Sequence, residues 1–184
     1  MVLLGAFASA GSAGRLSLSA NTVNAVWARL IFSGGIGDVE CEVILTKTLH
    51  ARTMDKVRLR LMGYVTAANV TRCARGGVTV LRETAPWHVR YHSFGGTLPN
   101  ISGIRTLVVG LPFRIREPTF GIECLARSTP EEPMVLQYNL DAGRQITTAT
   151  VGGTVRCGGF TETFSGTSST ISEAGGARVT VTLI

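Results

Sequence analysis

Apolar and polar residues alternate with a period of two along most of the chain. From Val39 to Leu45, every second residue is Val, Cys or Leu, and the residues between them are Glu, Glu and Ile. A period of two places successive side chains on opposite faces of a β-strand, so each such stretch predicts a strand with one buried face. The same alternation predicts strands at residues 16–19, 26–32, 57–61, 78–83, 87–94, 113–116, 134–140 and 179–183.

Turn signals separate these stretches. Thr84-Ala85-Pro86 and Asp141-Ala142-Gly143 fit turns, and Ser93–Gly103 is expected to be the loosest connection. Glycine pairs at 34–35, 76–77, 95–96, 152–153, 158–159 and 175–176 punctuate the strands. No stretch has the i, i+3, i+4, i+7 pattern of a helix, so helices are expected to be absent or minor.

More than ten short strands joined by frequent turns predict an all-β fold. The expected architecture is an antiparallel β-sandwich or a barrel. No Pro-rich or Ser-rich linker interrupts the pattern, so residues 14–184 are expected to form a single β-domain.

The four cysteines occur in two similar contexts. Each segment opens with Gly, an aliphatic residue, Glu and Cys, and closes with Val, one or two residues including Arg, and Cys. The openings are Gly37-Asp38-Val39-Glu40-Cys41 and Phe120-Gly121-Ile122-Glu123-Cys124, and the closings end at Cys73 and Cys157. This echo favours Cys41–Cys73 and Cys124–Cys157 among the three pairings that four cysteines allow. It also suggests two similar halves, arranged as two sheets or as two subdomains.

The cysteine spacing also indicates the compartment. No Cys-x-x-Cys pair occurs, which argues against a zinc site or a thioredoxin-type redox centre. Disulfides form and persist in oxidising compartments. The cysteines therefore predict a protein that is secreted, extracellular or attached to the cell surface.

Residues 1–13 form an apolar N-terminal tail. The pattern of small residues, Ala8-Ser9-Ala10 and Gly11-Ser12-Ala13, resembles the end of a secretory signal peptide, although the usual basic region is missing. A second interpretation is a strand donated to the sheet edge of a neighbouring copy, with Val2, Leu3, Leu4 and Phe7 in the contact. A third is a tail that folds back on its own subunit.

The charge balance is basic but dispersed. The chain has 18 basic and 12 acidic residues, a formal net charge of +6, and its arginines are scattered with no run of four. A basic balance suits nucleic acid, an anionic glycan or an acidic cell surface. Scattered arginines are more typical of the solvated face of a sheet, so no nucleic-acid partner is expected. No run of 18 apolar residues occurs, so no membrane-spanning segment is expected.

Few residues suggest reaction chemistry. His88 and His92 share a strand face about 13 Å apart, too far for one ion to bridge, so no metal site is expected. Glu40 and Glu123 occupy matching places in the two segments, and paired carboxylates facing each other remain an alternative to simple repetition. No Gly-x-Ser-x-Gly elbow and no phosphate-binding glycine loop occurs. The protein is therefore predicted not to be an enzyme and to need no cofactor.

Two stretches resemble sequences of a known group. Thr-Ala-Pro-Trp-His-Val-Arg-Tyr-His-Ser-Phe at 84–94 and Gly-Thr-Leu-Pro-Asn-Ile-Ser-Gly-Ile-Arg at 96–105 resemble uncharacterised secreted β-rich proteins of actinobacteria. The four cysteine contexts fit the same resemblance. It implies an exported all-β protein and assigns no activity to any residue.

Two functional hypotheses follow. The first is an exported structural protein that binds copies of itself, such as a filament subunit assembled by strand donation. The second is a monomeric secreted module that binds a cell-surface glycan or a small ligand. A deep apolar pocket lined by Trp87 or Trp27 would favour the second. An aromatic binding platform could be formed by Trp27, Trp87, Tyr64, Tyr91 and Tyr138, although these residues are first expected in the core.

Overall fold

The computed structural model describes residues 14–34 and 37–184, and in these ranges the all-β prediction is confirmed. Apart from one 3-10 turn at Arg82–Thr84, the regular elements are strands with antiparallel partners. They are β1 (Arg15–Leu18), β2 (Thr22–Gly34), β3 (Gly37–Leu49), β4 (Thr53–Asp55), β5 (Leu61–Cys73), β6 (Gly77–Val80), β7 (Trp87–Thr97), β8 (Asn100–Val109), β9 (Pro112–Arg116), β10 (Glu123–Arg127), β11 (Met134–Leu140), β12 (Ile146–Cys157), β13 (Phe160–Thr167), β14 (Thr170–Glu173) and β15 (Val181–Leu183).

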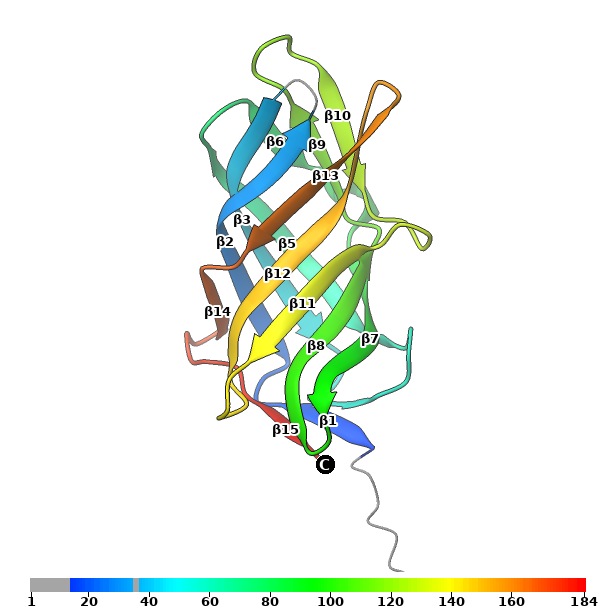
Figure 1. The fold of residues 1–184 in the computed structure, drawn as a ribbon, viewed down its shortest axis with the longest axis vertical. Coiled ribbons are helices and arrows are strands. Elements are labelled where there is room, and N and C mark those ends of the chain that lie inside the picture. Colours follow the sequence, from blue (N-terminus) through cyan, green and yellow to red (C-terminus); the bar gives the residue numbers. More distant parts are fainter. Residues whose placement is uncertain (1–13, 35–36) are drawn as a thin grey trace, which may run out of the picture.

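Eight of these strands form a closed ring of antiparallel ladders (Figure 1). Each strand is hydrogen-bonded to the next in the order β2, β3, β5, β7, β8, β11, β12 and β13. β13 then pairs with β2, which completes the circuit. Of the two predicted architectures, the barrel describes this ring. A sheet that closes on itself leaves no free edge around its circumference.

A second layer covers the upper end of the ring in Figure 1. β6, β9 and β10 form this layer, and β12 connects the layer to the ring. Up to Gly152, β12 pairs with β11 of the ring, and at Val155 and Arg156 β12 pairs with β10 of the layer. Phe113 of β9 packs into the ring, with its ring centroid 5.5 Å from that of Phe32 and 6.1 Å from that of Phe164. The upper half of the molecule is therefore built from two packed layers.

A small sheet closes the lower end (Figure 1). It has the strand order β15-β1-β4, and it buries Leu16, Leu18 and Val181. The Arg15 N–H donates to the Ile184 carbonyl at 3.0 Å, and the Ile184 N–H donates back at 3.1 Å. The last strand of the chain is thus paired within its own molecule.

The two disulfides are Cys41–Cys73 and Cys124–Cys157, the pairings that the sequence echo favours. Each joins facing residues of neighbouring antiparallel strands, with Cα–Cα distances of 4.0 and 4.4 Å. β3 lies antiparallel to β5, and β10 and β11 both lie antiparallel to β12. In each segment, the strand that holds the second cysteine pairs with the strand that holds the first: β5 with β3, and β12 with β10.

Two expectations about local structure are wrong. Residues 57–60 form a loop and no strand, because Leu59 has a φ of 65° and its N–H donates to the Tyr91 carbonyl, so β5 begins at Leu61. Ser93–Gly103 is no loose connection, because it contains the tight β7–β8 hairpin, in which Thr97 faces Asn100.

Two glycine pairs lie inside strands and not between them. Gly95 and Gly96 belong to β7, where the register shifts and Gly96 has a φ of 84°. Gly152 and Gly153 belong to β12, at its change of partner. A Cβ on Gly153 would lie 2.4 Å from the Phe164 ring, so close packing requires glycine there.

Candidate anion-binding face

β7 carries a row of basic side chains on the outside of the ring. Trp87, Val89 and Tyr91 point inward and are buried, so strand alternation turns His88, Arg90 and His92 outward. β8 contributes Arg105, and the β4–β5 loop contributes Arg58. We call these five residues the basic face: His88, Arg90, His92, Arg58 and Arg105.

His92 lies within electrostatic reach of two of the guanidinium groups. Partial burial and the positive charges of Arg58 and Arg105 lower the pKa of His92 below its usual value. His92 Nδ1 lies 2.9 Å from Ser93 Oγ, so the hydroxyl fixes the orientation of the ring. An anion bound beside His92 would offset the repulsion from the two arginines and favour the imidazolium form.

Neutral groups orient two of the three arginines of the face. Arg105 Nε donates to Gln137 Oε1 at 3.2 Å, and Arg90 Nη1 donates to the Leu59 carbonyl at 3.4 Å. A neutral acceptor orients a guanidinium without cancelling its charge, so both groups keep an electrostatic preference for an anion.

One carboxylate lies beside the face, and other cations engage it. Asp55 forms an ion pair with Arg15 at 2.8 Å and a second ion pair with Arg60. The pKa of Asp55 is lowered by the hydrogen bond from Arg15 and by the charges of both arginines, which outweigh the opposing effect of burial. Asp55 therefore does not neutralise the basic face.

The uneven distribution of charge along the chain can be counted in the sequence, although the absence of any run of arginines makes it easy to overlook. Residues 43–116 contain twelve basic and two acidic residues, whereas the rest of the chain contains six basic and ten acidic residues. The positive charge is thus concentrated in the segment that includes β5, β7 and β8. A charge count over a long window would have located this segment before the fold was known.

A row of aromatic rings borders the face. The Tyr64 ring on β5 lies 5.1 Å from the His50 ring and 5.4 Å from the His88 ring, measured between centroids. Tyr64 is half-buried, whereas Trp27, Trp87, Tyr91 and Tyr138 are buried inside the fold. Of the five aromatic residues considered for a binding platform, Tyr64 alone is available at the surface.

The described residues contain neither a metal-binding cluster nor the facing pair of carboxylates, Glu40 and Glu123, that the sequence left open. No three His, Cys, Asp or Glu side chains of residues 14–34 and 37–184 gather in a way that would hold a metal ion. Cys41 and Cys124 point inward and are buried, so strand alternation turns the preceding residues, Glu40 and Glu123, outward, and the two carboxylates do not face each other. Glu40 instead pairs with Arg29 at 2.5 Å, and Glu123 lies opposite Arg116 in the ladder.

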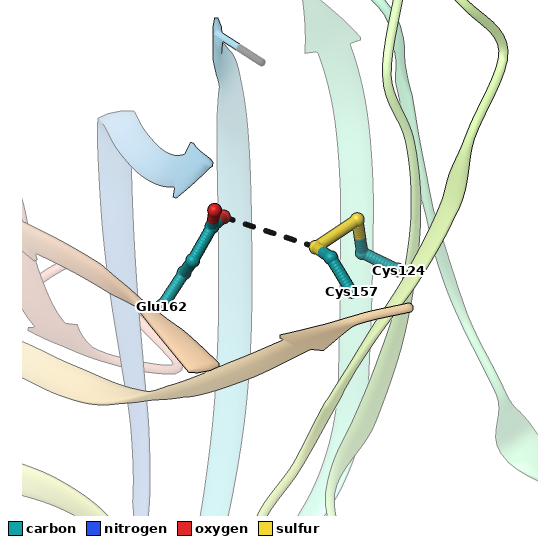
Figure 2. The surroundings of a disulfide bond; sticks show 3 residues. All are labelled: Cys124, Cys157 and Glu162. Atoms are coloured by element: carbon teal, nitrogen blue, oxygen red, sulfur yellow. Dashed lines mark hydrogen bonds between the residues drawn. A yellow bond between two sulfur atoms is a disulfide. The ribbon is translucent and has the colours of Figure 1, made fainter. Parts of the chain in front are cut away.

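A different carboxylate lies near a disulfide. Figure 2 shows Glu162 pointing toward Cys124–Cys157, with Oε2 3.8 Å from Cys157 Sγ. A disulfide sulfur carries no proton, so this is a packing contact and not a hydrogen bond to an ionised carboxylate. Glu162 and Glu117 line a cavity of about 10 Å³, which has room for about one water molecule.

Two shallow surface hollows lie beside the disulfides, with volumes of about 380 and 350 Å³. Each contains an arginine that pairs with a glutamate: Arg72 with Glu42 at 3.4 Å, and Arg156 with Glu132 at 2.6 Å. Because their charges are paired, these hollows attract an anion less strongly than the basic face does.

Sequence reasoning missed the cation inside the ring. Lys47 is 6% exposed, and its Nζ lies 3.2 Å from Tyr138 Oη and 4.4 Å from the centroid of the Tyr138 ring. Its position could have been found, because Lys47 follows Val43 and Leu45 at the inward positions of β3. The residues expected to mediate assembly, Val2, Leu3, Leu4 and Phe7, lie outside the described residues.

Comparisons with family models, with curated proteins and with solved structures found no match to this chain. No helix in residues 14–34 or 37–184 has the length and apolar character needed to cross a membrane.

Proposed function

We propose that this protein is an exported β-module that binds an anionic glycan of the cell surface through the basic face. The ligand is a polymer whose carboxylate, sulfate or phosphate groups contact Arg90, Arg105 and Arg58. The uncompensated positive charge on a rigid ring carries this proposal. Preorganised guanidinium groups bind oxyanions with little ordering cost.

The strand geometry favours an extended polymer as the ligand. His88, Arg90 and His92 follow one another at alternate positions, which places them about 7 Å apart along β7. A chain of anionic sugars that lies along the strand would meet the Arg90 guanidinium flanked on either side by an imidazole ring that can hydrogen-bond to it. Tyr64 and His50, at the border of the face, offer rings against which a sugar can pack.

Two disulfides support the exported part of the proposal. Cys41–Cys73 and Cys124–Cys157 account for the four cysteines, and such bonds persist where the surroundings are oxidising. The assignments of the protein as secreted and as a non-enzyme stay predictions.

Self-assembly by strand donation also stays a prediction, and the ring geometry gives it less support. The eight ring strands are paired on both sides, and β15 pairs with β1. Donation needs an unpaired strand edge, and the ring leaves such an edge only in part, as along the end of β5, where residues 67–73 pair with β3 and not with β7. The observation in favour of self-association is the exposure of Phe120, in the β9–β10 loop, and of Phe160, the first residue of β13, which are 71% and 74% exposed.

Binding to polygalacturonate, heparin and neutral dextran tests the proposal. We expect the two anionic polymers to bind, dextran not to bind, and added salt to weaken the binding. Arg105→Gln should weaken it by roughly three- to tenfold, because a charge-assisted contact is lost. Arg114→Gln, with the same charge change on the exposed side of β9, should leave the affinity unchanged.

Two results would contradict the proposal. One is equal weakening by Arg105→Gln and Arg114→Gln, which would reduce the binding to net charge alone. The other is duplex DNA that binds as tightly as the glycans, which would show a general polycation surface.

A further inference from the structure

The loop between β4 and β5 alternates basic and exposed apolar residues. It reads Lys56-Val57-Arg58-Leu59-Arg60, and Val57 and Leu59 are 54% and 48% exposed. Both aliphatic residues have a basic residue before and after them in the sequence, and neither side chain is part of the buried core. This loop is separate from the β7 row of His88, Arg90 and His92, although Arg58 also belongs to the basic face.

Leu59 is held in a backbone conformation that its side chain disfavours. Its φ of 65° lies in the left-handed region, where a bulky L residue is an outlier. The Leu59 N–H donates to the Tyr91 carbonyl at 2.7 Å, and the Tyr91 N–H donates to the Arg60 carbonyl at 2.9 Å. The Arg60 N–H closes the turn by donating to the Val57 carbonyl at 3.1 Å.

These hydrogen bonds fix the loop against β7 and make its shape rigid. Strained backbone persists where neighbouring structure imposes it, and such strain is concentrated at sites of function. Asparagine or glycine would relieve the strain at position 59. Leucine at position 59 instead exposes apolar surface to water, which is unfavourable. A partner with an apolar component would bury this surface and would explain why leucine occurs there.

The charges of the loop identify that partner. Arg58 is exposed and lies between the two aliphatic residues in the sequence, whereas Arg60 is ion-paired with Asp55 and Lys56 lies over the Phe94 ring, 5.4 Å from its centroid. A hydrophilic polyanion would satisfy the cations and leave Val57 and Leu59 in water. An anionic lipid surface satisfies both, because phosphates lie directly above hydrocarbon.

We propose that the loop of residues 56–60 docks on an anionic lipid bilayer. Val57 and Leu59 enter the boundary between head groups and acyl chains, and Lys56 and Arg58 contact lipid phosphates. The contact is peripheral and reversible, since two aliphatic side chains give modest affinity. It would place the β7 row next to the membrane, within reach of glycans attached there.

Vesicle co-sedimentation of the full chain tests the proposal. Vesicles of roughly one-third phosphatidylglycerol in phosphatidylcholine should bind the protein, vesicles of phosphatidylcholine alone should not, and salt should weaken the binding. Leu59→Asn should weaken it roughly three- to tenfold, because the exposed half of the leucine side chain no longer contributes apolar area to the interface. Arg58→Gln should weaken it about fivefold.

Two variants serve as controls. Leu59→Asn should fold at least as stably as the parent, because asparagine tolerates the left-handed conformation, so lost binding cannot reflect unfolding. Phe160→Asn removes a more exposed apolar side chain from the upper end and should leave vesicle binding unchanged.

Three outcomes would overturn the proposal: no binding to anionic vesicles, equal binding to neutral vesicles, or full binding by Leu59→Asn. A dimer that Leu59→Asn dissociates, without vesicle binding, would assign the loop to contact between copies. Glycan binding does not depend on this result, since Leu59→Asn leaves Arg90 and Arg105 in place.

Discussion

Lys47 places an ammonium group inside the ring, and its ladder partners on β2 and β5, Val23 and Val65, are both buried. Its described contacts are the hydroxyl and the ring face of Tyr138. Neither carries a full negative charge, and removing an ammonium group from water costs several kcal/mol. The cation–π contact and the hydrogen bond offset part of that cost, about 2 and 1 kcal/mol respectively. Lys47 therefore specifies the arrangement of the interior more than it stabilises it.

Replacing both partners of this contact should raise the stability of the protein. Lys47→Met combined with Tyr138→Phe keeps the volumes similar and leaves no hydroxyl without a partner. We expect the free energy of unfolding in urea to increase by about 1–3 kcal/mol. Lys47→Met alone should gain less, since it leaves the Tyr138 hydroxyl unpaired. A double variant less stable than the parent would show that the ammonium has a stronger partner.

The loop between β9 and β10 depends on one carboxylate. Glu117 is buried, and its two carboxylate oxygens accept hydrogen bonds from the N–H groups of Thr119 and Phe120, each at 2.6 Å. The Glu117 N–H donates to the Ile122 carbonyl at 2.9 Å, which closes the loop. Glu117 thus fixes the backbone that presents Phe120 to solvent.

This loop should loosen in acid. Burial opposes ionisation of Glu117, but hydrogen bonds from Phe120, Thr119 and Gly121 outweigh it and hold its pKa below the ordinary value of 4.5. A lowered pKa means that the stabilisation is complete above pH 4.5 and is lost as the pH falls through the folded-state value. The amide NMR signals of Thr119 and Phe120 should therefore shift below pH 4.5.

Glu117→Gln should abolish that acid-dependent shift and leave the loop less ordered at pH 7. Glu123→Gln is the matched control, because Glu123 is exposed on the adjoining strand and should leave the shift in place. Signals that titrate identically in the parent and in Glu117→Gln would show that another group controls the loop.

Period two predicted about half of the strands, because alternation is a local property, and it missed long strands such as β8 and β12. It located the strands around Val39–Leu45 and Met134–Leu140, and it placed His88 and His92 on one side of β7. It failed at residues 57–60, where the sequence alternates but hydrogen bonds to Tyr91 impose a turn. Those bonds come from residues about thirty positions away, so no local pattern contains them.

The basic face could not be predicted from local alternation, because it also depends on contacts between residues distant in the sequence. Alternation indicates which residues of β7 point outward, but Arg58 and Arg105 approach His92 only through loop geometry and the β7–β8 register. A shift of one residue in that register would have turned Arg105 inward. The closed ring was equally hidden, because it rests on the β13–β2 ladder between distant parts of the chain.

On the scale of the whole molecule, the two disulfides have unequal surroundings. Cys41–Cys73 lies at one end of the long β3–β5 ladder, whose other pairs we expect to persist without it. Cys124–Cys157 joins the upper layer to the ring where β10 and β12 pair through two residues each, Leu125 with Arg156 and Ala126 with Val155. In the chain-entropy model each bond contributes roughly 3–4 kcal/mol, because the loops are of similar length. The local consequences of removing them should nevertheless differ.

Removing Cys124–Cys157 should release the upper layer while the ring stays intact. In the double variant Cys124→Ala and Cys157→Ala, we expect hydrogen exchange measured by mass spectrometry to accelerate in β6, β9 and β10, with β7 and β8 still protected. The matched variant Cys41→Ala and Cys73→Ala should lower the melting temperature without exposing that layer selectively. Because the basic face lies on the ring strands β7 and β8 and on the β4–β5 loop, both variants should keep their affinity for anionic glycans. Uniform acceleration across all strands in the first variant would mean that the ring and its upper layer unfold as one cooperative unit.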